Sequence, residues 1–271
     1  MNVVWFKKDL RLHDHEALFN AMCANEPCLF LYIFEPILLN DSHYSKRHFN
    51  FIKQSLVDLQ KQLHDINSDL LVVEADAKEV FSKLHEKYTI NQVFSHQETG
   101  ILVTYQRDLA LKQFFKSNGI QWNEFVHNGV FRGLSNRDRW IKLWESHMNQ
   151  KQIPFNENSK CLISRQKINE IQNQFKSVDL KTNKSPKMQQ GGRKFGLQYL
   201  STFLKDRYKN YQKNISKPLA ARTSCSRLSP YITWGNLSMR EVVQAAEQKQ
   251  TNSKKSLSQF KSRLRWQAHF I

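Results

Sequence analysis

The chain has 271 residues, 40% of them hydrophobic, and a formal net charge of +17 at pH 7. This length and hydrophobic content are sufficient for a buried core in one large or two ordinary domains, so a disordered chain is excluded. The positive charge indicates a partner that carries phosphates, such as nucleic acid, although lysines that only keep a protein soluble raise the charge in the same way.

The cysteines and the hydropathy pattern bear on where the protein works. Cys23, Cys28, Cys161 and Cys225 stand at none of the spacings that metal sites use, so no metal site is predicted. Neither a signal peptide nor a long apolar run is present in the sequence. We expect a cytoplasmic protein that is not inserted in a membrane, and we expect a monomer.

Residues 1–130 alternate short apolar runs with amphipathic windows. This alternation predicts a doubly wound α/β domain with a five-stranded parallel sheet, because short, wholly apolar runs are typical of strands buried on both faces. The predicted strands are Val3 to Phe6, Cys28 to Phe34, Leu70 to Val73, Gln92 to Ser95 and Trp122 to Val126. The predicted helices are Tyr44 to Asp65, Asp76 to Lys87 and Ile101 to Ser117.

A charged segment, residues 7–15, follows the first predicted strand, where ligands of α/β sheets collect. Asp14 is predicted to cap a helix that starts at His15. For each charged residue taken singly, we favour a solvated loop with a cap. No G-x-G-x-x-G motif follows the strand, so a Rossmann dinucleotide site is not predicted.

Residues 131–190 are polar and are predicted to link two domains. Their last part, residues 169–190, is rich in Lys, Asn, Gln and Ser, which predicts an exposed connection. Arg139, Trp140 and Trp144 suit phosphate contacts and base stacking on nucleic acid. The same spacing is typical of a helix that buries its tryptophans, and we favour this second interpretation.

Residues 191–271 show helical spacing and are predicted to form an all-α segment. Tyr211 continues a row of apolar steps from Leu197, so it is expected on the buried face. Gly235 is predicted to end a helix, and Ser238 to cap the next one together with Glu241. In the last helix we expect a buried stripe and a basic, aromatic stripe beside it. The two stripes are Leu257, Phe260, Leu264 and Ile271, and Arg263, Trp266, Gln267 and Phe270.

The stretch 222–238 gathers hydroxyl and guanidinium groups just before a predicted helix. Pro230 suits the first turn of a helix, which makes Ser229 the expected N-cap. Such groups at a helix start bind phosphate, while an ordinary serine-capped turn explains the composition equally well. The side chains concerned are Arg222, Thr223, Ser224, Ser226, Arg227 and Ser229.

Two motifs, far apart in the chain, resemble one family. The run T-S-x-S-R-L-S-P-Y-x-x-W-G-x-L-S-x-R-E resembles the flavin-phosphate segment of the photolyase/cryptochrome family, and the opening V-V-W-F-K-K-D-L-R-L-H-D-H-E-A-L resembles its N-terminal signature. The resemblance implies that residues 1–130 form the α/β (antenna) domain, 131–190 a linker and 191–271 the start of the helical FAD-binding domain. Members of the family are usually much longer, so we expect an N-terminal portion of a longer polypeptide or a naturally short product, which binds flavin weakly or not at all by itself and is inactive alone.

The resemblance also implies individual roles. The residues implied to bind FAD are Tyr211, Cys225, Ser226, Arg227, Leu228, Ser229, Phe260, Arg263 and Gln267. Those implied to contact DNA or its lesion are Arg263, Trp266 and Phe270. Three of these residues depart from the usual pattern of the enzymes that repair cyclobutane dimers, in which a glutamate, a tryptophan and an arginine are common at the positions of Arg263, Phe260 and Gln267. The type of lesion therefore stays open.

Family members also carry an auxiliary light-harvesting chromophore, a folate or a deazaflavin, in the first domain. The segment H-Q-E-T-G, followed by T-Y-Q-R-D, looks like part of some bacterial members, and Glu98 falls near the carboxylate of the folate-binding ones. A carboxylate at the start of a helix explains Glu98 equally well.

Three functions are therefore considered. The first is blue-light-driven, FAD-dependent repair of pyrimidine dimers in DNA, in which the excited flavin passes an electron to a dimer flipped out of the duplex. The second is a cryptochrome-type photoreceptor that binds flavin and signals without repair. The third is a nucleotide-binding α/β module with a basic tail and no flavin.

Overall fold

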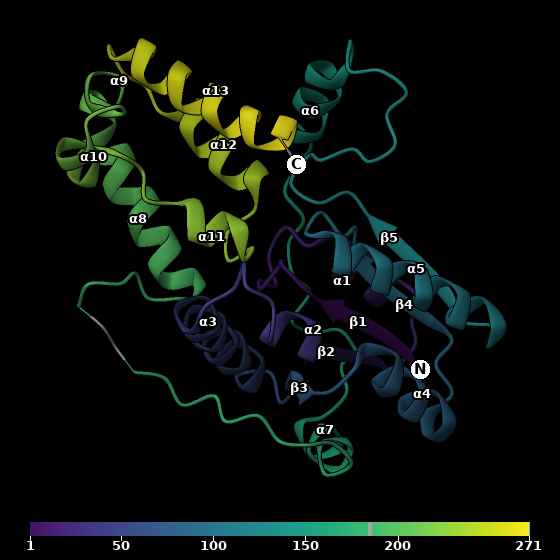
Figure 1. The fold of residues 1–271 in the computed structure, drawn as a ribbon. Coiled ribbons are helices and arrows are strands. Elements are labelled where there is room, and N and C mark those ends of the chain that lie inside the picture. Colours follow the sequence, from purple (N-terminus) through teal and green to yellow (C-terminus); the bar gives the residue numbers. More distant parts are fainter. Residues whose placement is uncertain (184–185, 271) are drawn as a thin grey trace.

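A parallel five-stranded sheet organises the first half of the chain (Figure 1). The computed structural model describes residues 1–183 and 186–270. The strand order is β3-β2-β1-β4-β5, which confirms the predicted doubly wound fold. The strands are β1 (Asn2–Phe6), β2 (Cys28–Phe34), β3 (Leu71–Glu74), β4 (Gln92–His96) and β5 (Gln121–Phe125).

The central strand β1 contributes side chains to two separate hydrophobic cores, one on each face of the sheet, because successive side chains of a strand point to opposite faces. Val3 and Trp5 pack into the core under α4 (Ala77–Tyr88) and α5 (Leu102–Ser117). Val4 and Phe6 pack into the other core, which continues into the second half of the chain. The remaining helices of the first half are α1 (Glu16–Cys23), α2 (Pro36–Leu39) and α3 (Lys46–His64). Since one core spans both halves, the halves pack as one body.

The start of α1 differs from the prediction. Helix α1 begins at Glu16, and His15 is its N-cap, because its Nδ1 accepts the backbone N–H of Leu18 at 3.0 Å. Asp14 does not cap the helix: it has a φ of 51° and forms a 2.7 Å ion pair with Arg240. The cap was misplaced because the carboxylate has a stronger, distant partner that local sequence does not reveal.

The predicted linker contains two helices, α6 (Trp140–Met148) and α7 (Arg165–Gln172). Trp144 is 4% exposed, which confirms the favoured interpretation of a helix that buries its tryptophan. Ile171 is buried in the core on the α4 side of the sheet, so residues 169–172 belong to a packed helix, and the prediction of an exposed connection from residue 169 was wrong there. The predicted connection also includes residues 184–185, which lie outside the described residues.

The described residues from 191 onward form no strand, as predicted. Gly235 has a φ of 68°, and the Ser238 hydroxyl accepts the N–H of Glu241 at 2.9 Å, which confirms the predicted stop and the Ser238 cap. The part predicted for Glu241 was wrong, because its carboxylate accepts from Arg193 instead. Ile271, expected at the end of the buried stripe, lies outside the described residues. The helices are α8 (Arg193–Lys205), a 3-10 turn η1 (Arg207–Asn210), α9 (Tyr211–Asn214), α10 (Pro218–Ser224), α11 (Ser229–Thr233), α12 (Met239–Gln248) and α13 (Lys254–Phe270).

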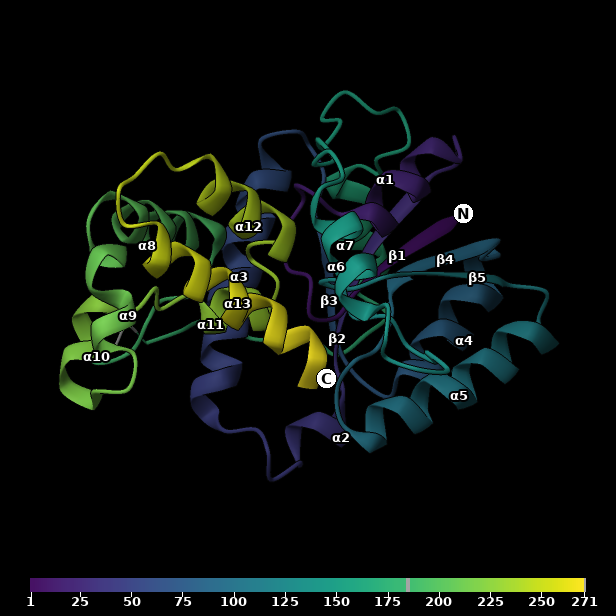
Figure 2. The same ribbon diagram turned by 90° about the horizontal axis from the view of Figure 1, so that it is seen from above.

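The helical half lies to one side of the sheet, and α3 lies where the two halves meet (Figure 2). The segment 7–15, which we call the docking loop, joins them. Leu10 N–H donates to Trp234 O at 3.0 Å, and Arg11 donates to Gly235 O at 3.1 Å. A Cβ on Gly235 would come within 2.3 Å of the Asp9 Cα, so only glycine fits this contact. The solvated loop considered for this segment was wrong, because the other half of the chain covers it.

Candidate functional site

The turn between α10 and α11, residues 225–229, has a backbone suited to an anion. Arg227 has a left-handed φ of 63°, and Leu228 follows in the right-handed region at φ −89° and ψ −10°. Successive residues of opposite handedness direct their N–H groups into one concavity, the arrangement called a nest, which binds anions. Ser229 is the first residue of α11 and Leu228 is its N-cap, so the predicted Ser229 cap was wrong. Because α11 has five residues, its helix dipole adds little.

Two of the hydroxyls expected at this turn are used by the fold. Thr223 Oγ1 donates to Ala220 O at 3.1 Å, and the buried Ser224 Oγ donates to the same carbonyl at 2.5 Å. The hydroxyl of Ser226 accepts the Leu228 N–H at 3.4 Å. Serine and threonine on a helix often bond back to its carbonyls, which removes Thr223 and Ser224 from the set that a ligand could use.

Arginines surround the turn. The guanidinium of Arg207, in η1, donates to Cys225 O and, at 3.4 Å, to Ser226 O. Burial lowers the pKa of Arg207, and the positive charge of Arg227 adds to that effect. The sequence analysis missed Arg207, because it lies 18 residues before Cys225 and in no motif.

Tyr211 and Phe260 come together beside the turn. Their ring centroids are 5.6 Å apart, and both rings pack edge-on or tilted against the buried Phe203. Burial raises the pKa of Tyr211 to about 12, and the charge of Arg263, on α13, acts in the opposite direction. Five of the predicted cofactor residues, on α9, the turn and α13, therefore gather in one region: Tyr211, Cys225, Arg227, Phe260 and Arg263.

Helix α13 carries the stripes that were predicted for it. Phe260 is 2% exposed and lies with Leu257 and Leu264 in the core. Trp266 and Phe270 are 47% and 73% exposed, with ring centroids 5.4 Å apart, while Arg263 is exposed and Gln267 is half-buried. An aromatic pair that stays on the surface next to arginine is suited to stacking on nucleic acid bases.

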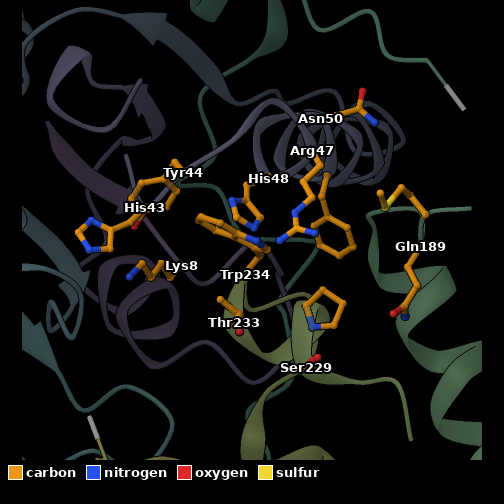
Figure 3. Close-up of a pocket in the computed structure, with 13 residues that line it drawn as sticks. Lys8, His43, Tyr44, Arg47, His48, Asn50, Gln189, Ser229, Thr233 and Trp234 are labelled. Carbon is orange, nitrogen blue, oxygen red and sulfur yellow. The ribbon is translucent and has the colours of Figure 1, made fainter. Parts of the chain in front are cut away.

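A cavity of about 540 Å³ opens between the start of α3, the end of β1 and α11 (Figure 3). The side chains of Arg47 and His48 reach from α3 toward Trp234 (Figure 3), whose ring lies 6.0 Å from that of Tyr44. No carboxylate is among the described residues that line it, which favours an acidic, planar ligand. Ser229 also lines the cavity, the one predicted cofactor residue to do so. The lining residues are Lys8, His43, Tyr44, Arg47, His48, Asn50, Phe51, Met188, Gln189, Ser229, Pro230, Thr233 and Trp234.

Glu98 lies in a buried ionic network at the carboxyl ends of the strands. Its carboxylate accepts from Arg107 at 2.9 Å and lies 3.9 Å from Lys8. Burial would raise the pKa of Glu98, but the charges of Lys7, Lys8 and Arg107 outweigh it and lower that pKa. Because α5 begins at Leu102, Glu98 is not a carboxylate of its first turn, so that alternative was wrong. As an antenna ligand, Glu98 stays a prediction.

Asp9, His15 and His96 form a buried group whose ligand atoms lie within 4.8 Å of one another. His15 Nδ1 accepts the Leu18 N–H, so its proton is on Nε2, which lies 3.0 Å from Asp9 Oδ2. His96 Nδ1 lies 2.6 Å from the same oxygen. His96 therefore donates to the Asp9 carboxylate, whereas His15 Nε2 lies near the same oxygen without forming a hydrogen bond to it, and His15 would have to give up its helix cap to bind a metal.

The cavity, the turn and the fold together define a class of protein: an α/β domain packed against helices, with a basic cavity where the two meet and a turn beside Arg207 and Arg227 within the helical half. In the part of the chain that the structure describes, the helices are too short or too polar to cross a membrane.

Comparisons with known proteins narrow this class. The family model described as DNA photolyase matches residues 2–133. Cryptochrome-2 of Gallus gallus is 26% identical, over 88% of this chain and 44% of its own length. A cryptochrome of Synechocystis sp. PCC6803 has the same fold, with a TM-score of 0.75 at 20% identity over all of this chain and 60% of that one. An archaeal photolyase from Sulfolobus tokodaii, solved with two FAD molecules, has a TM-score of 0.69 at 21% identity over all of this chain and 58% of that one.

Residues 2–133 match the DNA photolyase family, and over most of its length the chain is similar to a cryptochrome in sequence and to a cryptochrome and a photolyase in fold. It spans 44% of the Gallus gallus relative and about 60% of the two solved structures.

Proposed function

We propose that this chain takes part in blue-light-driven, FAD-dependent repair of pyrimidine dimers in DNA. The observation that carries the proposal is the geometry of the 225–229 turn: Arg207 donates to the carbonyls of Cys225 and Ser226, Arg227 lies in the turn at positive φ, and neither arginine has a carboxylate in ion-pair distance among the described residues. The charge of Arg227 acts on the guanidinium of Arg207, and a diphosphate bound between them would relieve that repulsion. The two FAD molecules in the Sulfolobus tokodaii photolyase support FAD as the ligand.

The residues present fit this cofactor at its diphosphate. The N–H groups of the 225–229 turn and the guanidinium of Arg227 would hold the phosphates, and Arg263 would add charge from α13. When bound, FAD supplies the light-driven electron transfer that splits a dimer. In the described conformation Phe260 is enclosed by Phe203 and Tyr211, so we assign it the role of a wall behind the cofactor; Gln267, half-buried on α13, remains a proposed contact.

The DNA-binding surface that we propose centres on Trp266 and Phe270. Both side chains are exposed on α13, and Arg263 is exposed one turn before Trp266. A base taken out of the duplex exposes its faces, which these two rings can stack against, while the net charge of +17 attracts the phosphate backbone. The chain would act as a monomer in the cytoplasm.

The 540 Å³ cavity is proposed as the place of the antenna chromophore, a folate or a deazaflavin. Lys8, Arg47 and the two histidines of the α3 region would hold its acidic groups, and Tyr44 and Trp234 would pack on its rings. Glu98, buried beneath Lys8, would act through that lysine. Titration of the chain with a methenyl folate and with a deazaflavin tests this, and an Arg47→Met variant that binds either one as tightly as the wild type contradicts it.

A photoreceptor of the cryptochrome type is the second candidate. The similarity to Cryptochrome-2 of Gallus gallus over 88% of the chain favours it, and so does Arg263 at a position where dimer-repair enzymes often carry glutamate. In this second candidate function, the chain binds flavin at the same site but does not repair DNA.

One experiment separates the two. The protein, supplied with reduced FAD, is mixed with an oligonucleotide that contains one thymine dimer and is exposed to blue light, and the dimers left are counted by chromatography against a dark control. Repair that is lost in Trp266→Ala supports the enzyme. In a full-length protein that contains this chain, FAD binding without repair supports the photoreceptor, and the absence of FAD binding contradicts both functions.

A further inference from the structure

The side chain of Arg207 forms hydrogen bonds with backbone carbonyls of the 225–229 turn. Besides the carbonyls of Cys225 and Ser226, its guanidinium donates to Tyr199 O at 2.7 Å and to Thr202 Oγ1 at 3.0 Å. Its donors are thus shared between the end of α8 and two successive peptide carbonyls of the turn. A planar guanidinium with donors in a fixed fork can hold such a set of oxygens in one geometry, and an ammonium cannot.

The position of the Arg207 side chain explains why the turn has its shape. With the carbonyls of Cys225 and Ser226 directed at the guanidinium, the backbone of Arg227 takes the left-handed φ of 63° that creates the nest. A non-glycine residue at positive φ costs about 1 kcal/mol or more and persists only where its surroundings hold it. Two neighbours hold this backbone: Arg207 on the carbonyls before Arg227, and Gln189, whose Nε2 donates to Arg227 O at 2.7 Å.

Every hydrogen-bond partner of Arg207 is neutral. In the described part of the chain no carboxylate lies within ion-pair distance of it, and its ring neighbours are Phe203 and Tyr199, with centroids 5.7 and 5.9 Å away. Its positive charge is therefore left uncompensated behind the turn, near the charge of Arg227. Two guanidiniums beside one nest suit a ligand with two linked negative groups better than a ligand with one.

We propose that Arg207 is a positioning residue that shapes the 225–229 turn and, with Arg227, makes it selective for a diphosphate diester over a monophosphate. The inference rests on the proposed flavin function for its ligand, but the shaping of the turn is a property of the free protein. No motif contains Arg207, and its role comes only from the contacts above.

The test compares the wild type with Arg207→Lys and Arg207→Met, and with Lys205→Met as a control that removes an exposed charge from the end of α8. Amide hydrogen exchange of a peptide that covers residues 225–229 is measured without ligand. FAD, ADP-ribose and AMP are then titrated; the last two carry a similar net charge, as a diphosphate diester and a monophosphate. Thermal unfolding shows that each variant is folded.

We expect exchange of the amides of Cys225 and Leu228, which have acceptors in the turn region, to rise about tenfold or more in both Arg207 variants and to stay unchanged in Lys205→Met. We expect the affinity for FAD and ADP-ribose to fall about tenfold or more in Arg207→Met, and less in Arg207→Lys, with little change for AMP. The preference for ADP-ribose should therefore disappear in Arg207→Met.

The two proposals fail in different ways. If the wild type binds neither FAD nor ADP-ribose, the flavin function is wrong, and the exchange data alone decide whether Arg207 shapes the turn. If exchange and the preference for ADP-ribose are both unchanged in a folded Arg207→Met protein, the positioning role is wrong even if FAD binds.

Discussion

The docking loop and the 225–229 turn are both rich in charge, and the difference between them is whether the charges are paired. In the docking loop, Lys7 pairs with Asp108 at 3.2 Å, and Asp14 with Arg240 at 2.7 Å. At the turn, Arg227 has no carboxylate in ion-pair distance among the described residues. Buried charges that are fully paired serve the fold, whereas charges that are left unpaired beside an open backbone are available to a ligand.

The largest effect is expected from Arg240→Met, which removes the direct ion pair of the buried Asp14. The free energy of unfolding should fall by about 3 kcal/mol, because the carboxylate keeps its desolvation cost but retains the Ile153 N–H and the nearby charge of Arg11. Urea unfolding at pH 7.5 measures it. The matched control is Arg263→Met, an exposed arginine for which a change below about 0.5 kcal/mol is expected. If the two variants lost the same free energy of unfolding, the conclusion that paired charges stabilise the fold and unpaired charges do not would be wrong.

Gly235→Ala tests the close contact of the two halves. The new Cβ would lie 2.3 Å from Asp9 Cα and from Lys8 O, at a backbone φ of 68°. Strain at positive φ and the displacement of the docking loop should together cost about 2 to 4 kcal/mol of stability. Gly133→Ala is the control, since Gly133 also has positive φ but open space around it. A similar loss in both variants would mean that backbone strain alone, and not the contact, is at work.

Arg227→Ala is expected to act on the ligand and not on the fold. Loss of a charge-assisted phosphate contact should weaken FAD binding by about 2 to 3 kcal/mol, while the free energy of unfolding changes by about 0.5 kcal/mol or less. Flavin fluorescence titration measures the affinity for FAD, and urea unfolding measures the free energy of unfolding. Unchanged FAD affinity would count against the placement of the phosphates at this turn.

The smallest effect concerns pH. Burial, together with the charge of Arg240, lowers the pKa of His147 from 6.5 to about 4. The unfolded chain therefore takes up this proton below about pH 6.5 and the folded protein only near pH 4, so this part of the stability is complete above pH 6.5 and is lost as pH falls toward 4. In His147→Gln the urea midpoint should fall less between pH 7 and pH 4.5 than in the wild type. An identical pH profile would show that His147 does not titrate in this way.

The strands, the helical second half and the capping by Ser238 could be predicted from the sequence, because they depend on local periodicity and on turn chemistry within a few residues. The exposed aromatic stripe of Trp266 and Phe270 was predicted in the same way. Errors arose where a partner lies far along the chain. Asp14 was taken for a helix cap because its partner, Arg240, is 226 residues away.

By itself, the sequence determined the alternation of strands and helices and the family motifs. Both depend on residues that are close together in the sequence: the spacing of apolar residues in one case and the motif residues in the other. Only the tertiary structure decided which charges are paired, which hydroxyls are already used, and that Arg207 lies behind the 225–229 turn. The reason is physical: the energy of a charge or a polar group depends on the neighbours that folding brings to it, and these come from anywhere in the chain.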